Sequence, residues 1–320
     1  MLSLVDRVLV TGGAGFVGSH LVDRLVSEGF DVVVLDDLSS GRRENLSVHF
    51  GKSNFCLVEG DVRVKADVRK ALDGVDAVFH LAAIVSVDFS VKNPLLVNEV
   101  NVNGTLNVLR ESLKAGVKRF VYASSCAVYG DPVHLPIDEE QPTRPMSPYA
   151  VTKLTAEHYC RVFYEVYGLE TVCLRFFNVY GPRQVSGPYS GVITKFIGRL
   201  KRGEAPIIYG DGEQTRDFVF VRDVVDACLR AMRRKNCVDQ VINVGSGREI
   251  TISELAKILI RLFKVHKVKP VYTRSRAGDI KRSCADIGRA KESLGYEPKV
   301  FLVEGLKRLL IEYGINNDCK

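Results

Sequence analysis

Short apolar runs alternate with longer stretches in which apolar residues recur every three or four positions throughout the first half of the chain. The short runs, which are rich in valine, predict buried strands at residues 7–11, 31–35, 54–59, 77–80, 119–123 and 170–175. The longer stretches predict helices at residues 18–28, 98–115 and 149–167. Strands that alternate with helices are typical of a parallel sheet with helices on both faces. We therefore expect an α/β fold built on a doubly wound parallel sheet.

The pattern changes after residue 178, where the elements become shorter. Glycine and proline residues predict loops between these elements, at residues 181–182, 186–188 and 210–212. Residues 241–244 predict a further strand that returns to the main sheet. We therefore expect a large domain over residues 1–178, with a returning segment at about 218–247, and a smaller C-terminal substrate-binding domain over residues 179–320.

The composition narrows the classes of protein to consider. With 320 residues, 46% of them apolar and 26% charged, the chain resembles ordinary globular proteins. Its formal charge of +7 is scattered, and the densest basic cluster, residues 233–235, ends a predicted helix, where cations complement the helix dipole. Nucleic acid is therefore not expected as a partner. No apolar run reaches the roughly 18 residues that span a bilayer, and residues 1–10 lack a secretory pattern, so we expect a cytoplasmic protein without a membrane partner.

Cysteine and histidine give no sign of a metal centre. The eight cysteines include no C-x-x-C pair, and none of the six histidines stand at metal-ligand spacing. We therefore predict no metal, and whether any cysteines pair stays open.

A glycine-rich segment, residues 11–18, follows the first predicted strand and leads into the first helix. In such a segment Gly12 permits the tight turn, Gly15 lets the backbone approach a pyrophosphate, and Gly18 allows the helix to pack closely on the strand. Asp36 ends the second strand 18 residues after Gly18, where a carboxylate accepts from a ribose 2′-hydroxyl and repels a 2′-phosphate. These features predict a Rossmann-type domain that binds NAD in preference to NADP. The nearby Arg42-Arg43 pair weakens that preference, because arginine can hold the additional phosphate.

Candidate proton chemistry lies in the second half of this domain. Tyr149 and Lys153 stand four residues apart on one face of a predicted helix. A tyrosine has an ordinary pKa near 10, which a neighbouring ammonium group and a positive nicotinamide ring would lower. Ser124 and Ser125 follow the fifth strand, at the sheet edge where open α/β folds bind ligands. The sequence therefore predicts a serine–tyrosine–lysine group beside the cofactor.

Taken together, these motifs resemble the extended short-chain dehydrogenases/reductases, and closely the UDP-glucose/UDP-galactose 4-epimerase family. The resemblance covers nearly the whole chain, at residues 11–18, 60–62, 80–83, 101–105, 125, 149, 153, 174–178, 210–218 and 276–279.

The resemblance assigns roles to individual residues. It implies that the catalytic group is Ser125, Tyr149 and Lys153. It implies that the residues around NAD are Gly12, Gly15, Phe16, Val17, Gly18, Asp36, Asp37, Leu38, Ser39, Ser40, Gly41, Asp61, Val62, Leu81, Ala82, Ala83, Asn101, Ser124, Tyr149, Lys153 and Phe177. It implies that the residues around a UDP-sugar are Ser86, Ser125, Tyr149, Asn178, Val192, Tyr209, Arg216, Arg276, Asp279 and Ser283. Among these, Arg216 and Arg276 would hold the diphosphate, since guanidinium groups match phosphate oxygens.

The implied reaction is epimerisation at C4 through a transient 4-keto sugar, in which Tyr149 removes the proton and NAD takes and returns hydride. In related dehydratases and decarboxylases, acidic residues follow the catalytic hydroxyl, whereas here Cys126 and Ala127 do. That difference favours simple epimerisation. Ser283 stands where this family crowds the C2 substituent, and its small side chain extends the expected substrates to UDP-GlcNAc/UDP-GalNAc. Tyr272 lies upstream and is the aromatic residue that could take over this crowding.

Several alternatives stay open at this point. Another nucleotide-sugar converter, such as a UDP-glucuronate 4-epimerase, fits the same motifs. A plain NAD-dependent dehydrogenase would accumulate NADH, and a non-catalytic NAD-binding sensor would have no use for a base. By analogy with the family we expect a homodimer that pairs through the helices at 98–115 and 149–167.

Overall fold

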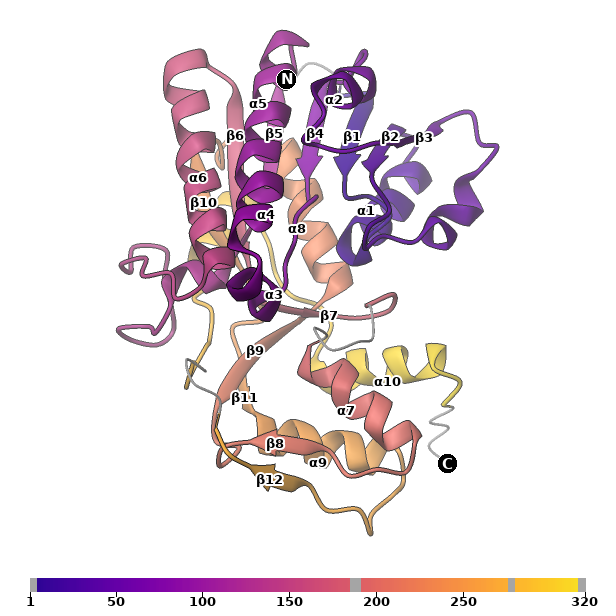
Figure 1. Ribbon diagram of the computed structural model, residues 1–320, viewed down its shortest axis with the longest axis vertical. Coiled ribbons are helices and arrows are strands. Elements are labelled where there is room, and N and C mark those ends of the chain that lie inside the picture. Colours follow the sequence, from indigo (N-terminus) through magenta and orange to yellow (C-terminus); the bar gives the residue numbers. More distant parts are fainter. Residues whose placement is uncertain (1–4, 185–190, 276–279, 316–320) are drawn as a thin grey trace.

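A seven-stranded parallel sheet forms the centre of the molecule in the computed structural model, which describes residues 5–184, 191–275 and 280–315 (Figure 1). The order across the sheet is β10-β6-β5-β4-β1-β2-β3, and every neighbouring pair is parallel. The strands are β1 (Arg7–Thr11), β2 (Asp31–Asp36), β3 (Phe55–Glu59), β4 (Ala77–His80), β5 (Arg119–Ser125), β6 (Glu170–Phe176) and β10 (Gln240–Val244). This is the Rossmann strand order with one strand added at an edge, so the predicted doubly wound sheet is confirmed.

Helices cover both faces of this sheet and enclose two separate apolar cores. The first face carries α1 (Phe16–Ser27) and α8 (Val221–Arg233), with the π-helical turn η4 (Ala290–Leu294). The second face carries α2 (Lys65–Ala71), α5 (Gly104–Lys114) and α6 (Pro148–Tyr167). The strands are buried on both sides, which explains their nearly continuous apolar sequences.

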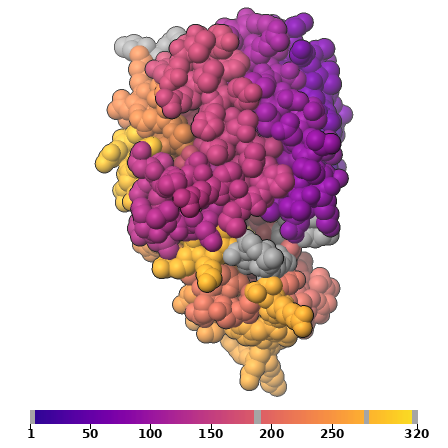
Figure 2. Space-filling model, turned by 60° about the vertical axis from the view of Figure 1, so that its left-hand side comes forward, coloured from indigo at the N-terminus to yellow at the C-terminus, as the bar shows by residue number. Residues whose placement is uncertain are grey.

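A smaller unit lies below the large sheet (Figures 1 and 2). Its strands form one sheet of three and one of two, namely β11-β9-β7 and β12-β8. These strands are β7 (Asn178–Tyr180), β8 (Ile207–Tyr209), β9 (Thr215–Phe220), β11 (Glu249–Thr251) and β12 (Val271–Thr273). The unit's helices are α7 (Val192–Lys201), α9 (Ile252–Leu262) and α10 (Leu302–Glu312), and they enclose a third apolar core. Within the described ranges, no helix is long and apolar enough to cross a membrane.

The helix predicted at residues 98–115 differs from the observed structure. The helical segment begins earlier, as α4 (Pro94–Asn98), continues through a π-helical turn η2 (Glu99–Asn103) and becomes α5. Proline at the first helical position fixes its start, since its missing N–H would be unpaired there in any case. The π turn directs Asn101 into the protein, where it is 1% exposed.

Further short helices complete the fold. They are α3 (Val87–Lys92), η1 (Arg43–His49) and η3 (Cys126–Tyr129). Helix α8 and strand β10, from the segment predicted to return, both belong to the layers of the large sheet. The domain boundaries at residue 178 and at about 218–247 stay a prediction.

Candidate active site

The predicted phosphate-binding turn lies between β1 and α1. Gly12 has a φ of +70°, and a Cβ there would lie 2.7 Å from the backbone nitrogen of Ala82. A Cβ on Gly18 would lie 2.1 Å from the carbonyl oxygen of Gly12. Both positions therefore require glycine. Gly15 is the N-cap of α1 and no side chain caps the helix there, so the first N–H groups of the helix have no side-chain acceptor of this kind and suit a phosphate.

Asp36 ends β2 beside this turn and is 7% exposed. Its carboxylate accepts hydrogen bonds from the backbone N–H groups of Ala14 and Leu38, each at 2.9 Å. Burial raises the pKa of Asp36, and the two N–H donors oppose that rise. These two donors fix the carboxylate, which the sequence predicts as the acceptor for a ribose hydroxyl, and the loop at residues 37–41 borders it. A Cβ on Gly41 would lie 2.8 Å from this carboxylate, which shows how closely the loop approaches.

The residues predicted around adenine, Asp61 and Val62, follow β3, the strand beside β2 at the edge of the sheet. Asp61 follows β3 and accepts from the backbone N–H of Arg63 at 2.8 Å and from its Nε at 2.9 Å. The hydrogen bonds from Arg63 lower the pKa of Asp61. Val62 is buried and packs on Gly104, where a Cβ would lie 2.7 Å from the valine side chain.

The catalytic candidates come together at the carboxyl end of β5. Helix α6 begins after Ser147, whose side chain accepts from the N–H of Ala150 at 3.2 Å, and it presents Tyr149 and Lys153 to the sheet. Tyr149 is 8% exposed and Lys153 3% exposed. Ser125 hydrogen-bonds the Tyr149 hydroxyl, and the Lys153 Nζ donates to the carbonyl oxygen of Ala123 at 2.7 Å. The three side chains of the predicted group therefore lie together, with Tyr149 and Lys153 buried and Ser125 partly buried.

The ionisation of this group differs from the sequence expectation. Burial raises the pKa of Tyr149 to about 12, and the hydrogen bond from Ser125 only partly opposes it. Burial also lowers the pKa of Lys153 to about 8, which the carboxylate of Glu157 opposes. The Lys153 Nζ lies 6.0 Å from the centre of the Tyr149 ring. The chain's own groups thus keep the phenol neutral at pH 7, and Lys153 alone does not bring its pKa down.

A chain of buried hydrogen bonds connects the phosphate-binding turn with the catalytic helix. Its centre is His80, the last residue of β4, whose Nδ1 lies 2.7 Å from the Thr11 hydroxyl and whose Nε2 lies 2.9 Å from the Thr105 hydroxyl. The Thr105 hydroxyl donates to the carbonyl oxygen of Asn101 at 2.6 Å, so it accepts from Nε2–H and Nδ1 is the unprotonated nitrogen. Burial lowers the pKa of His80 to about 3, which keeps the ring neutral. Asn101 in turn donates to the Thr152 hydroxyl at 3.0 Å.

Sequence reasoning gave no role to four residues of this hydrogen-bonded chain: Thr11, His80, Thr105 and Thr152. The available signal was a histidine that ends an otherwise apolar strand. Asn101 was predicted beside the cofactor. In the structure its amide nitrogen donates one hydrogen bond to the Thr152 hydroxyl and one to the carbonyl oxygen of Ile84. The predicted residues 81–83 lie half-buried at the sheet edge directly after His80.

Most of the described residues predicted around the substrate belong to the smaller unit. Arg216 on β9 donates to the carbonyl oxygens of Thr215 and Ile280, both at 2.7 Å, and its charge acts on the thiol of Cys126 beside Ser125. Ser283 is 6% exposed. The remaining positions are Ser86 at the start of α3, Asn178 at the start of β7, Val192 at the start of α7 and Tyr209 at the end of β8. Phe177, which was predicted beside the cofactor, is buried directly before β7. Arg276 and Asp279 lie outside the described residues.

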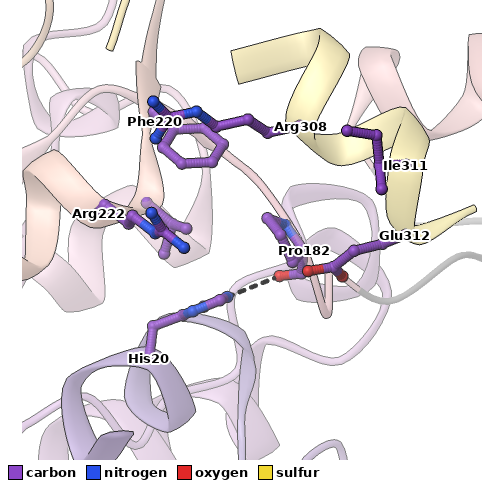
Figure 3. A pocket seen from close by; sticks show the side chains of 8 residues that line it. His20, Pro182, Phe220, Arg222, Arg308, Ile311 and Glu312 are labelled. Carbon is purple, nitrogen blue, oxygen red and sulfur yellow. Dashed lines mark hydrogen bonds between the residues drawn. The ribbon is translucent and has the colours of Figure 1, made fainter. Parts of the chain in front are cut away.

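A separate cavity of about 230 Å³ lies between α1, α8 and α10 (Figure 3). The His20 Nε2–H donates to the carbonyl oxygen of Pro182 at 3.0 Å across it, and Arg222, Arg308 and Glu312 complete much of its wall. Its described lining residues include none of those predicted for the site. This hydrogen bond joins α1 to the loop that follows β7.

The fold and the site define a dinucleotide-binding enzyme with the serine, tyrosine and lysine of the short-chain dehydrogenases/reductases. The family model described as "NAD dependent epimerase/dehydratase family" matches residues 8–245. The chain belongs to this family of NAD-dependent enzymes, and within it to the extended short-chain dehydrogenases/reductases of the UDP-glucose 4-epimerase family.

Individual relatives agree with this assignment. The chain is 42% identical over 305 residues to the UDP-glucose 4-epimerase of Mycolicibacterium smegmatis, covering 94% of this chain and 96% of that protein. It is 41% identical to the UDP-glucose 4-epimerase of Thermotoga maritima, solved with UDP-glucose, with a TM-score of 0.91 over 96% of this chain and 98% of the other. It is 39% identical to a UDP-N-acetylglucosamine 4-epimerase from Methanobrevibacter ruminantium, solved with UDP-N-acetylmuramic acid, with a TM-score of 0.92 over 97% and 99%.

Proposed function

We propose that this protein interconverts UDP-hexoses at C4, with UDP-glucose and UDP-galactose as a substrate pair. The observation that carries the proposal is that no acidic side chain directly follows Ser125, which hydrogen-bonds the buried Tyr149. Burial raises the pKa of the neighbouring Cys126 to about 12, so this residue stays a thiol. Ala127 has no ionisable group at all. These two positions therefore supply no acid or base for chemistry at C5 or C6, and proton transfer is left to Tyr149.

The glycine turn and Asp36 fit NAD. Gly12 and Gly18 leave no space for a Cβ, which keeps the turn flat enough for a pyrophosphate. Arg43, one of the two arginines that could attract a 2′-phosphate, is ion-paired with Glu59. Asp36 would receive the ribose hydroxyls, and Lys153, whose ammonium has three donors and gives one to Ala123, would reach the nicotinamide ribose. When bound, NAD accepts hydride from the sugar and returns it, and its positive ring favours an ionised phenol nearby.

The chain's own groups divide the remaining tasks. Tyr149 as phenolate takes the proton of the 4-hydroxyl and gives it back, with Ser125 hydrogen-bonded to both oxygens. Arg216 holds the diphosphate, so the 4-keto sugar stays attached through UDP while it turns its other face to the cofactor. Because each cycle ends with the cofactor in its starting form, no NADH accumulates. This distinguishes the reaction from that of a dehydrogenase.

A second candidate substrate pair is UDP-GlcNAc and UDP-GalNAc. The segment that carries Ser283 is tied to β9, because Thr215 N–H donates to the carbonyl oxygen of Lys281 at 2.9 Å and Arg216 reaches Ile280. Tyr272, the aromatic residue that could crowd this place, is bound elsewhere: its hydroxyl lies 3.2 Å from the Ser253 hydroxyl. A serine in this position leaves room for an N-acetyl group at C2.

We also propose that the enzyme is a homodimer. Apolar side chains are exposed on α3, α4 and α6, three helices that pack on one another. The residues are Val87, Val91, Leu95, Val151, Val162 and Val166, between 43% and 82% exposed. Apolar patches of this kind are typical of interfaces. Helix α5, by contrast, exposes mainly Arg110 and Lys114, so the proposed pairing uses α4 where the sequence favoured residues 98–115.

One experiment tests the reaction. The purified enzyme is incubated separately with UDP-glucose, UDP-GlcNAc and UDP-glucuronate, the products are resolved by chromatography, and absorbance of NADH is followed. We expect the C4 epimer of UDP-glucose without net NADH, and almost complete loss of turnover in Tyr149→Phe with the fold intact. Products from UDP-glucuronate alone, or stoichiometric NADH, would contradict the proposal.

A further inference from the structure

A buried ion pair lies directly behind the catalytic lysine. Glu157 is on α6, four residues after Lys153, and is 4% exposed. Its two carboxylate oxygens accept from Arg175 on β6, from Nε at 2.9 Å and from Nη2 at 2.7 Å. The Arg175 guanidinium also lies over the ring of Tyr129, at 4.6 Å from its centre. Spacings of four and eight residues place Glu157 on the same helix face as Lys153 and Tyr149.

Glu157 also fixes the strand end that carries the catalytic serine. The same carboxylate oxygen that binds the Arg175 Nε accepts a hydrogen bond from the Ser124 hydroxyl. Ser124 is 3% exposed and immediately precedes Ser125. One side chain thus connects the end of β5, the strand β6 and the catalytic helix.

The charges in this buried cluster are unequal. Lys153 and Arg175 are cations, and Glu157 is the anion beside both, attracting the proton of Lys153. Burial keeps the other ionisable groups that face the cluster neutral at pH 7, because it lowers the pKa of His80 and raises those of Tyr122, Tyr129, Cys126 and Cys173. If the charge of Glu157 were removed, two cations would remain together in a low dielectric. Because an arginine does not lose its proton in proteins, Lys153 would be the residue that loses its proton.

This balance decides where the catalytic pair loses its first proton. The productive form has an ionised Tyr149 and a charged Lys153, and the unproductive form has a neutral tyrosine and a neutral lysine. Glu157 is separated from Lys153 by one helical turn and from Tyr149 by two, so its negative charge stabilises the charged lysine more than it opposes the phenolate, and removing it favours the unproductive form. Resting on the proposed function, we propose that Glu157 is a positioning residue that keeps Lys153 charged and holds Ser124 in place, so that ionisation occurs at Tyr149.

The test is Glu157→Gln in the NAD-loaded enzyme, since glutamine keeps a side-chain oxygen for Ser124 and removes the charge. We expect kcat near neutral pH to fall about tenfold or more. A tenfold fall corresponds to a change of about one pKa unit in the difference between the pKa values of Tyr149 and Lys153. We expect the ultraviolet signal of ionised Tyr149, taken as the difference from the same protein with Tyr149→Phe, to fall in proportion. Adding Arg175→Gln removes the uncompensated cation and should restore much of that signal.

The chain offers a matched control at the opposite end of the same strands. Arg119 at the start of β5 is 1% exposed and pairs with Glu170 at the start of β6 at 2.7 Å. The Glu170 side chain is 37% exposed, so Glu170→Gln should reduce thermal stability only slightly, with kcat and the phenolate signal unchanged.

Three results would overturn the role of Glu157. They are a wild-type kcat in Glu157→Gln, a loss of kcat in Glu157→Gln with an unchanged phenolate signal, and equal losses of kcat in Glu157→Gln and Glu170→Gln. A wild-type enzyme that converts no UDP-sugar would instead refute the proposed function, and the phenolate titration would still decide the role of Glu157.

Discussion

Replacing Lys153 with methionine should make the folded protein more stable while it removes activity. Lys153 is 3% exposed, and burial lowers its pKa from 10.5 to about 8. At about 1.4 kcal/mol per pKa unit, this difference means that keeping the buried lysine charged lowers the stability of the folded protein by roughly 3 kcal/mol at pH 7. Methionine is similar in length and apolar. It gives up the hydrogen bond to Ala123, a loss of about 1 kcal/mol, so we expect a net gain of about 2 kcal/mol.

The pH dependence identifies the cause. Between pH 8 and 10.5 the unfolded lysine is protonated and the folded one is not, so the stability of the wild-type protein rises with pH in that window. Below pH 8 the cost is fully present, and above 10.5 it has disappeared. The advantage of Lys153→Met should therefore be largest at pH 7 and shrink as the pH approaches 10.5.

The assay is urea unfolding of both proteins at about pH 7 and at about pH 10, followed by circular dichroism. Burial raises the pKa of Tyr149 to about 12, which reduces stability above pH 10 in both proteins and cancels in their difference. The reasoning is refuted if Lys153→Met is less stable at pH 7, or if the difference between the two proteins is independent of pH.

Three further predictions concern specificity and assembly. Ser283→Tyr should reduce turnover of UDP-GlcNAc at least about tenfold and spare that of UDP-glucose; equal effects on both sugars in a chromatographic assay would count against the place given to Ser283. Asp36→Asn should weaken NAD binding about tenfold and narrow the preference over NADP, measured by calorimetry, whereas an unchanged preference would remove Asp36 from the ribose site. Leu95→Glu together with Val166→Glu should produce a monomer in light scattering, and a persistent dimer would place the interface on another face.

The sequence predicted the frame of this protein well because its strongest signals are local. The strands at residues 7–11 and 77–80 match β1 and β4 residue for residue, since fully buried parallel strands require continuous apolar runs. The glycine turn was equally predictable, as backbone contact at Gly12 and Gly18 excludes every other residue.

What the sequence did not predict depends on contacts between distant segments. Glu157 meets Ser124 and Arg175 only after β5, β6 and α6 have packed together, and a glutamate on a helix is ordinarily exposed. The π turn around Asn101 has no local signature, because the side chain is drawn inward by Ile84 and Thr152. The neutral phenol of Tyr149 was unexpected for a related reason: burial, which outweighs the effect of Lys153, is a property of the assembled core.

The position of β10 at the edge of the large sheet affects how the protein can be made. This strand and helix α8 come from late in the chain, yet they pair with β6 and cover the same core as α1. A released chain that ended at residue 178 would expose the edge of β6 and the apolar residues Val172 and Leu174 to solvent. Synthesis must therefore proceed well beyond the cofactor-binding motifs before the cofactor site can close, and a fragment cut there would aggregate.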